Sequence, residues 1–440
     1  MPDVEIEAFL SLYRRYRSGP SKISDWDSIR MPDADGLVPY DSFPVPDRKG
    51  TRAALSRLAV CKLNGGLGTS MGCPGAKSLI VVKEGKTFLD LILEQLREIR
   101  AVHGVDVPLV LMNSFYTQEE TQKTLDGHRY RSFVEGFQQS KFPRFREDNG
   151  ALLDAREYGR EAWYPPGHGD IFHCLQNRGA LEKLLNAGKN ILFVSNADNL
   201  GAEVDARILS HMLEEDIPFL MEVTQKTLAD VKGGVLYHDG SRLRLLEIAR
   251  VPDERLEDFY NLEKFRFFNT NNIWINLAHL RKRLDEGPLD LEVIVNRKTV
   301  AGIDVVQLET AIGSGLDHFP AARGALVGRE RFLPVKKTDD LLLVQSDLFK
   351  LEGGRLVRNP ARTKSGLPQV KLGKSFARLE DYFARFRSIP NILDLDSLTL
   401  DGEVRFEENV TLRGNVSIVS HNAHMTIPKG SVLENCLVEN

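Results

Sequence analysis

The sequence predicts an α/β protein with a mostly parallel mixed sheet flanked by helices, followed by a parallel β-helix at the C-terminal end. Three observations carry this prediction. Short apolar runs alternate with amphipathic segments between residues 51 and 330, as in sheets whose parallel strands are connected by helices. A glycine-rich loop at 62–78 stands between two apolar runs, and a six-residue apolar repeat begins at Leu398.

The first 50 residues predict one amphipathic helix, because Ile6, Phe9 and Tyr13 have helical spacing. A proline-rich run at 38–48 follows, which we interpret as an irregular arm on the surface of the core.

The alternating region yields six predicted strands: 58–63, 79–82, 107–112, 190–195, 217–224 and 269–276. The predicted helices between them are 87–100, 117–126 and 178–187. Thr117 and Glu120 are in register for a capping box at the start of the second helix. Because ligands bind beyond the carboxyl ends of parallel strands, we expect the loops after residues 63, 112 and 195 on one edge of the sheet.

Composition narrows the class of function. A chain of 440 residues is long for one core and predicts two or three domains. The net charge of −4 argues against a general nucleic-acid binder, and no apolar run approaches the roughly 18 residues of a membrane helix. The acidic start lacks a signal-peptide pattern, and the four cysteines lack metal-ligand or C-x-x-C spacing. We therefore expect a cytoplasmic protein with reduced thiols.

The loop at 62–78 contains five glycines and a lysine near each end. Glycines let backbone N–H groups converge on an anion, and Lys77 can place a charge on a phosphate. A P-loop would need glycines where Met71 and Ala76 stand, and a dinucleotide fingerprint would need its third glycine at Met71. The loop is therefore predicted to hold phosphate in a pattern different from both.

Asn196 and Asp198 directly follow the apolar run 191–194. A carboxylate just past a strand end suits Mg²⁺, which binds one or two carboxylates together with substrate phosphates. An Asx-rich turn without a metal is the alternative, and the phosphate-binding loop elsewhere in the chain favours the metal.

Other polar segments offer contacts for a ligand rich in hydroxyl or amide groups. His168 stands between glycines in an aromatic–proline turn, and Gln139 offers an amide able to hydrogen-bond a base edge. Further candidates for the same wall are Gly234, Glu247, Asn271 and Asn296. Lys336 follows Pro334, which favours an extended approach. Phosphate neutralisation and a solvated basic turn are both open interpretations there.

The C-terminal segment changes period. Two apolar columns repeat every six residues: Leu398, Val404, Val410 and Val416, and Leu400, Phe406, Leu412 and Ile418. A hexad repeat is typical of a parallel β-helix, in which each short strand stacks on the equivalent strand one turn later. The segment is long enough for about two coils, so we expect it to pack on the core or on another subunit.

Longer strings carry a resemblance to a known family. The strings occur in order: N-G-G-L-G-T-S-M-G-C in the loop, MNSF at 112–115, WYPPGHGD at 163–170, VSNADNLGA at 194–202 and RFLPVKKTDD at 331–340. Together they resemble the eukaryotic-type UTP–glucose-1-phosphate uridylyltransferases, from about residue 50 to the end.

The resemblance implies a GT-A-like nucleotidyltransferase fold and a left-handed C-terminal β-helix. The implied division is 1–50 as an N-terminal helical arm, 51–385 as the catalytic domain and 386–440 as the β-helix domain.

The resemblance also implies roles for individual residues. Those placed on the nucleotide are Leu63, Asn64, Gly65, Gly66, Lys77, Gln139, Gly167 and Asn196. Those placed on the sugar phosphate are His168, Gly234, Glu247, Asn271 and Asn296. Asp198 would bind Mg²⁺, and Lys77 and Lys336 would be the catalytic cations.

The implied reaction makes UDP-glucose and pyrophosphate from UTP and glucose 1-phosphate with Mg²⁺. A homo-oligomer formed through the β-helix is expected, and neither nucleic acid nor a membrane is an expected partner. Two alternatives stay open: a UDP-sugar pyrophosphorylase acting on galactose or N-acetylglucosamine 1-phosphate, and a nucleotide-binding scaffold with a weak active site.

Two loop positions depart from the family pattern, which has a lysine where Pro74 stands and a proline where Ala76 stands. The loss of one positive charge near the triphosphate predicts a higher UTP requirement. Because Lys77 is retained, activity is expected to persist.

Overall fold

The computed structural model describes residues 1–19, 25–33, 35–73, 75–127, 134–227, 230, 233–421 and 424–440. The chain divides into two compact units. Unit 1 contains Met1–Gly65, Ile99–Asn196 and Val204–Phe332, and unit 2 contains Gly66–Glu98, Ala197–Glu203 and Leu333–Asn440. Pro74 lies outside the described residues.

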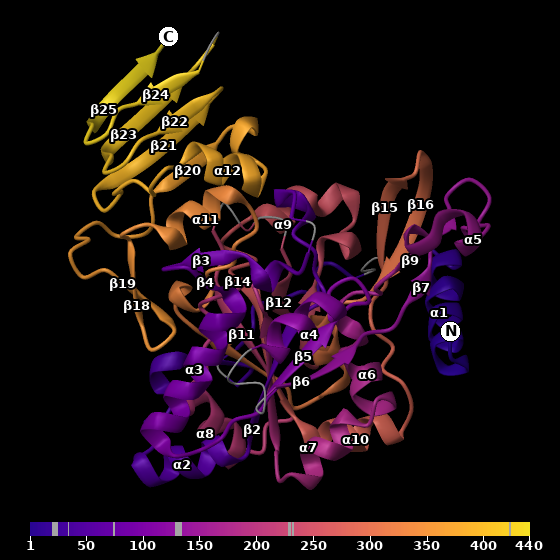
Figure 1. Cartoon of the computed structure of the whole chain (residues 1–440). Coiled ribbons are helices and arrows are strands. Elements are labelled where there is room, and N and C mark those ends of the chain that lie inside the picture. Colours follow the sequence, from indigo (N-terminus) through magenta and orange to yellow (C-terminus); the bar gives the residue numbers. More distant parts are fainter. Residues whose placement is uncertain are drawn as a thin grey trace. The chain divides into compact units, whose positions relative to one another are not determined.

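A ten-stranded mixed sheet forms the centre of the described part of unit 1 (Figure 1). Its main path runs through β1 (Leu37–Pro39), β17 (Arg323–Leu326), β11 (Phe219–Gln225), β14 (Phe267–Asn276), β10 (Ile191–Asn196), β2 (Leu58–Asn64), β5 (Leu109–Asn113) and β6 (Val134–Gln138). The hairpin β12 (Val235–His238) and β13 (Leu243–Leu246) joins this sheet through β14. β10, β2, β5 and β6 are parallel neighbours, whereas β14 is antiparallel to β10 and β11. The predicted mixed α/β fold with a central sheet is confirmed.

The central strands form because their residues are apolar on both faces. Every residue of β5 is buried, and in β2 the alternation of apolar with polar residues is absent up to Cys61. Ala59 and Cys61 pack into one cluster with Leu192 and Val194 of β10. Strands that are covered on both faces have continuous apolar runs in their sequence, and for this reason these strands could be predicted from the sequence.

The helices of unit 1 are α1 (Asp3–Arg17), α2 (Arg48–Ser56), α4 (Gln118–Asp126), α5 (Ala155–Tyr158), α6 (Ile171–Asn177), α7 (Ala180–Asn186), α8 (Ala206–Glu214), α9 (Leu256–Tyr260) and α10 (Leu277–Asp285). α3 (Phe88–His103) has residues in both units. Small sheets in unit 1 are β15 (Ile294–Val300) with β16 (Ile303–Glu309) and β8 (Phe145–Arg146), and β7 (Phe142–Pro143) with β9 (Trp163–Tyr164). None of the helices in the described part of the chain has the length and apolar character that a membrane crossing requires.

The N-terminal segment is more ordered than expected. The predicted helix is α1, whose Phe9 packs edge-on against Phe142 with ring centroids 5.6 Å apart. The start of the predicted irregular arm is strand β1, which pairs in parallel with β17. Gly324 of β17 makes this pairing close, because a Cβ there would lie 2.9 Å from the side chain of Leu37.

The carboxyl ends of the parallel strands align as predicted. Asn64 of β2 is the register partner of Asn113 of β5, which in turn pairs with Gln138 of β6. Asn196 of β10 pairs with Leu63 on the other side of β2. Polar side chains therefore line one edge of the sheet.

The predicted capping box at the start of α4 is wrong. Thr117 makes no side-chain cap hydrogen bond. Its hydroxyl donates instead to the Asn64 carbonyl at 2.8 Å and accepts from the Ser114 amide at 3.0 Å. Tertiary contacts with the end of β2 thus outcompete the local cap.

The described part of unit 2 contains several small sheets, two complete helices and the first part of α3. Its elements are β3 (Val81–Lys83) with β4 (Lys86–Thr87), β18 (Phe349–Glu352) with β19 (Arg355–Arg358), β20 (Gln369–Leu372) with β21 (Leu395–Asp401), β23 (Thr411–Val419) and β25 (Val432–Glu439), β22 (Val404–Phe406) with β24 (Met425–Ile427), α11 (Thr338–Gln345) and α12 (Leu379–Arg385). The predicted strand 79–82 begins later, at Val81, because residues 77–79 form a 3₁₀ turn.

The β20-β21-β23-β25 sheet is parallel and stands at the C-terminal, yellow end of the chain (Figure 1). Leu398 pairs with Val416 and Leu400 with Ile418, so the register between β21 and β23 is a multiple of the six-residue repeat. Both predicted apolar columns are buried in one cluster of unit 2. Because this region consists of separate small sheets, the β-helix stays a prediction.

A buried carboxylate connects three segments of unit 1. Glu222 of β11 is 0% exposed and accepts hydrogen bonds from Trp274 Nε1 at 2.8 Å and Asn272 Nδ2 at 3.0 Å. The Arg331 guanidinium donates to both of its oxygens, at 2.7 and 2.5 Å. Full hydrogen bonding of this kind is what makes a buried charge tolerable.

We predict that Glu222→Ala lowers the free energy of unfolding by about 3–5 kcal/mol, because it removes the buried carboxylate to which the largely buried Arg331 donates two hydrogen bonds. Chemical denaturation followed by circular dichroism measures the change. Glu119→Ala is the matched control, since it breaks the exposed Lys123–Glu119 pair on α4 and should leave the transition midpoint unchanged. Equal midpoints for Glu222→Ala and the unmodified chain would contradict the role given to Glu222.

Candidate active site

Two lysines and one carboxylate converge in unit 2. Asp198 is 7% exposed, and its Oδ2 lies 2.5 Å from Lys77 Nζ and 3.1 Å from Lys336 Nζ. Lys336 is about half exposed, whereas Lys77 is largely covered. Residues more than 100 positions apart in the sequence thus form one charge cluster.

The glycine-rich loop positions Lys77. The backbone pairs Leu67 with Ala76 in an isolated bridge, and the Lys77 amide donates to the Gly66 carbonyl at 3.3 Å. Between them, Met71 is fully buried in the core cluster of unit 2. Gly72 has a φ of +67°, a left-handed conformation that glycine adopts without strain. The loop is therefore an ordered structure that fixes the backbone position of Lys77.

The segment before α11 positions Lys336. Pro334 bridges to Asn199, and the Val335 amide donates to the Asp198 carbonyl at 3.1 Å. The Lys336 amide donates to the Asp340 carboxylate at 2.7 Å. These contacts align the lysine-bearing segment with the segment that carries Asp198.

The Asp198 carboxyl is ionised in this setting. Burial raises its pKa, but the ammonium groups of Lys336 and Lys77 outweigh burial and hold the pKa below its ordinary value. Both lysines use Oδ2, and the buried Oδ1 has no hydrogen-bond partner among the described residues. A buried carboxylate oxygen without a partner is costly unless a ligand completes it.

The donor set at Asp198 fits a hard cation held together with phosphate. Among the described residues, no group of three or more His, Cys, Asp or Glu side chains is arranged as a metal cage. Mg²⁺ does not need such a cage, since it is usually held by one or two carboxylates plus substrate phosphates. The orphaned Oδ1 of Asp198 supplies one such carboxylate oxygen.

At the strand ends of unit 1, several of the predicted nucleotide residues form a second group. The Ser114 hydroxyl donates to the Gly65 carbonyl at 2.8 Å, and Asn64 Nδ2 donates to Asn113 Oδ1 at 2.7 Å. Gln139 follows β6, and its backbone N–H donates to the Asn113 backbone carbonyl at 2.8 Å. These bonds link the ends of β2, β5 and β6.

Gln139 lies directly against Gly65. A Cβ at residue 65 would lie 2.0 Å from Gln139 Nε2, so only glycine fits this position. Gln139 is 6% exposed, and its Oε1 has no hydrogen-bond partner among the described residues. An amide held in this way can offer a donor and an acceptor to one edge of a base.

Asp170 fixes the segment that follows Gln139, a role that the sequence did not reveal. Its carboxylate accepts from the Ser140 amide at 2.6 Å and the Ser140 hydroxyl at 3.1 Å, directly after Gln139. Asp170 is the last residue of the string WYPPGHGD, which is the only sequence pattern that singles it out. That string does not predict that Asp170 contacts Ser140.

Gly167 and His168 lie against the segment after β16. Gly167 has a φ of +84°, and a Cβ there would lie 2.5 Å from the Thr310 carbonyl. His168 Nδ1 accepts a hydrogen bond from the Ile312 amide at 3.0 Å. In the neutral ring this places the proton on Nε2, a donor suited to a phosphate oxygen. Thr310 therefore forms one wall of this turn.

The remaining predicted residues form three local pairs in unit 1. Asn271 has a φ of +61° and donates from Nδ2 to Asn196 Oδ1 at 3.0 Å. Asn296 Nδ2 donates to Glu309 Oε1 at 3.1 Å.

Gly234 and Glu247 form the third pair. A Cβ at residue 234 would lie 2.5 Å from Glu247 Oε1, and burial raises the pKa of the Glu247 carboxyl.

The predicted site residues therefore fall into two groups. Gly66, Lys77, Asp198 and Lys336 belong to unit 2, and the other predicted residues belong to unit 1. The division between the units falls at the covalent links 65–66 and 196–197, inside both predicted motifs.

The chain matches a family model described as UTP–glucose-1-phosphate uridylyltransferase over residues 6–413. A UTP–glucose-1-phosphate uridylyltransferase of Hordeum vulgare is 48% identical over 436 residues, which cover 98% of this chain and 92% of the relative. The Saccharomyces cerevisiae relative of the same name is 47% identical over 446 residues, covering 99% and 88%.

Solved structures agree with these matches. A UDP-glucose phosphorylase of Trypanosoma brucei has a TM-score of 0.88 at 37% identity, with 99% of this chain and 96% of that chain covered. A variant of the Leishmania major UDP-glucose pyrophosphorylase, in complex with UDP-glucose, has a TM-score of 0.89 at 33% identity and the same coverage. The chain belongs to the UTP–glucose-1-phosphate uridylyltransferase family.

Proposed function

We propose that the protein transfers the uridylyl group of UTP to glucose 1-phosphate, forming UDP-glucose and pyrophosphate. The observation that carries this proposal is the convergence of Lys77 and Lys336 on the buried Asp198 carboxylate. Membership of the family supports the choice of reaction. Two cations beside a carboxylate oxygen without a partner are the groups that phosphoryl-transfer chemistry needs.

A phosphate oxygen of glucose 1-phosphate attacks the α-phosphorus of UTP, and the bond from that phosphorus to the α–β bridging oxygen breaks. Pyrophosphate leaves with the electron pair of that bond. The nucleophile is already an anion, so no general base is required. The work of the protein is to bring two anions together in line and to neutralise charge on the departing oxygen.

Lys77 and Lys336 are proposed for the second task. Each ammonium is held on Asp198, and a polyphosphate would compete for both. Asp198 would hold Mg²⁺ through its buried Oδ1. When bound, the ion supplies Lewis-acid neutralisation of the phosphate oxygens.

Unit 1 supplies most of the recognition groups in this proposal, and unit 2 adds Gly66. Gly65 and Gln139 are assigned to the uracil, with Leu63, Asn64, Gly66, Gly167 and Asn196 on the remainder of the nucleotide. His168 is assigned to the sugar phosphate, with Gly234, Glu247, Asn271 and Asn296 lining the glucose. Close backbone approach at Gly65 and Gly167 supports this assignment, because no larger residue fits either position.

Finer structural features are part of the same proposal. We infer a three-part division at residues 50 and 385, and a left-handed β-helix in the last part. The buried apolar columns and the parallel register between β21 and β23 support the β-helix. Val432 and Leu437 of β25 are 58% and 63% exposed, which supports a homo-oligomer formed through this segment. The four free cysteines support a cytoplasmic location.

The reaction and its sugar are tested by one measurement of pyrophosphate release from UTP, with glucose, galactose and N-acetylglucosamine 1-phosphates. We expect release with glucose 1-phosphate, and loss of release when EDTA removes Mg²⁺. Faster release with another sugar would assign a different UDP-sugar pyrophosphorylase activity. Absence of release with every sugar would leave the scaffold interpretation in place of the enzyme.

Lys336→Ala is expected to lower kcat by roughly a hundredfold or more, because one cation on developing charge is worth about 3–4 kcal/mol of barrier. Lys337→Ala is the matched control, since it removes the adjacent exposed lysine and should leave kcat unchanged. Steady-state kinetics of both variants measures the difference. An unchanged kcat in Lys336→Ala would remove Lys336 from the mechanism.

Gly65→Ala is expected to raise the KM for UTP by roughly tenfold or more, because the new methyl group displaces Gln139 from the position where it contacts the base. Gly127→Ala is the control, since a Cβ there meets nothing closer than 3.9 Å. The KM for UTP is compared at saturating glucose 1-phosphate. If the two variants had the same KM, the close approach of Gln139 to residue 65 would not serve UTP binding.

A further inference from the structure

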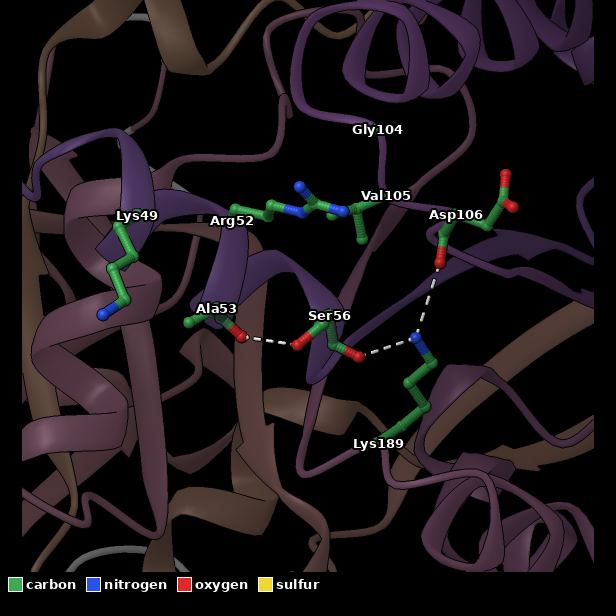
Figure 2. Close-up of a pocket in the computed structure, with 8 residues that line it drawn as sticks. All are labelled: Lys49, Arg52, Ala53, Ser56, Gly104, Val105, Asp106 and Lys189. Atoms are coloured by element: carbon green, nitrogen blue, oxygen red, sulfur yellow. Dashed lines mark hydrogen bonds between the residues drawn. The ribbon is translucent and has the colours of Figure 1, made fainter.

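A basic pocket lies in unit 1, outside the site proposed above. It has a volume of about 520 Å³. Its lining residues come from α2, the turn after α3 and the turn before β10: Lys49, Arg52, Ala53, Ser56, Gly104, Val105, Asp106 and Lys189 (Figure 2). A pocket of this volume is large enough for a small organic phosphate.

The charges around the pocket are unevenly distributed. Three of its lining residues are cations, in a chain whose net charge is −4. The single carboxylate, that of Asp106, pairs with Arg100 at 3.1 Å and points away from Lys189 (Figure 2). Lys49 and Arg52 are exposed, and neither has an ion-pair partner among the described residues. The residues that line this pocket therefore carry a net positive charge.

Lys49 and Arg52 project from one face of α2. They are three residues apart, a spacing that places two helical side chains side by side. The first turn of α2 contains no acidic residue. Figure 2 shows the Arg52 guanidinium extending toward Val105, whereas the Lys49 side chain extends in another direction. Because both side chains are exposed and flexible, they can turn toward one anion, and a guanidinium can donate two hydrogen bonds to it.

Lys189 holds the walls of the pocket together. Its Nζ donates to the Ser56 carbonyl at 2.8 Å and to the Asp106 carbonyl at 3.4 Å (Figure 2). Burial lowers the pKa of Lys189, and the nearby Asp106 opposes this. The ammonium has carbonyl contacts in place of a carboxylate partner, so an anion near it would improve its electrostatic environment.

The pocket lies at the amino ends of the strands whose carboxyl ends carry the nucleotide residues. Ser56 is two residues before β2, and Lys189 is two residues before β10. Asn64 is at the other end of β2, seven residues along a strand that rises about 3.3 Å per residue. The pocket is thus about 20 Å from that edge of the sheet.

We propose that this pocket binds a small phosphate-bearing anion, at a site separate from the one at the carboxyl ends of the strands. Lys49 and Arg52 contact the phosphate group, and Lys189 fixes the pocket floor. Inorganic phosphate, pyrophosphate and a sugar phosphate share the recognised group. They differ in how much of the pocket they fill.

The test uses the full chain and two double variants. Lys49→Gln with Arg52→Gln removes the two proposed phosphate contacts and leaves Lys189, whose loss would disturb the backbone. Arg14→Gln with Arg17→Gln is the matched control: it removes two exposed cations at the same spacing from α1. Equilibrium dialysis with radiolabelled inorganic phosphate counts saturable sites in each protein, with sodium chloride keeping the ionic strength constant.

We expect the pocket variant to lose one phosphate site, or to bind it at least about tenfold more weakly, while the control matches the unmodified chain. Any phosphate site at the strand ends is present in all three proteins, so the difference isolates the pocket. Competition by pyrophosphate and by glucose 1-phosphate then ranks the three ligands.

Two results would overturn the proposal. Identical phosphate binding in all three proteins would show that Lys49 and Arg52 hold no anion. An equal loss in both double variants would show a general effect of net charge. A thermal melt of each variant without phosphate establishes that the fold is retained, so that lost binding is not lost structure.

Discussion

The buried Asp198 carboxylate is the constraint on which the site in unit 2 depends. A charge that is 7% exposed must be compensated, and here the compensation comes from two lysines on separate segments. Backbone bridges at Leu67–Ala76 and Asn199–Pro334 fix the positions of those segments. The same two ammonium groups that stabilise the carboxylate are those a polyphosphate would engage. The stability of this charge cluster and its capacity to engage an anion therefore have one physical origin.

The strand ends of unit 1 differ from this charge cluster, because they offer a ligand hydrogen-bonding carboxamides in place of charged groups. Asn64, Asn113 and Gln138 are aligned by the register of adjacent parallel strands, so carboxamides gather at one edge without any special loop. Glycine at residue 65 then lets Gln139 approach the backbone at a distance that any Cβ would forbid. The sheet supplies the positions, and glycine supplies the space.

The sequence predicted those parts of the fold that depend on local patterns. Continuous apolar runs identified β2, β5 and β10, and the polar residues after them identified the edge where the site lies. It failed where a side chain serves a distant partner. Thr117 was predicted to cap a helix, but its hydroxyl donates to the Asn64 carbonyl. The residues near Glu222 in the sequence contain no pattern that predicts its pairing with Arg331, 109 residues later. The antiparallel direction of β14 is likewise set by its neighbours and not by its own residues.

The basic pocket also could not be predicted from local sequence patterns, because its charge depends on which segments the fold brings together. Its residues come from three short segments, each of which reads alone as an exposed polar turn or helix face. The parallel pairing of β2 with β10 brings the residues that precede both strands to one edge of the sheet. The positive charges of these segments then lie around one pocket. The same pairing brings Leu63 and Asn196 together at the opposite edge. One register thus builds two polar edges from one pair of strands: cations gather before the strands and carboxamides after them. A pair of parallel strands is therefore able to present a basic pocket before the strands and hydrogen-bonding carboxamides after them, about 20 Å apart, without any additional domain.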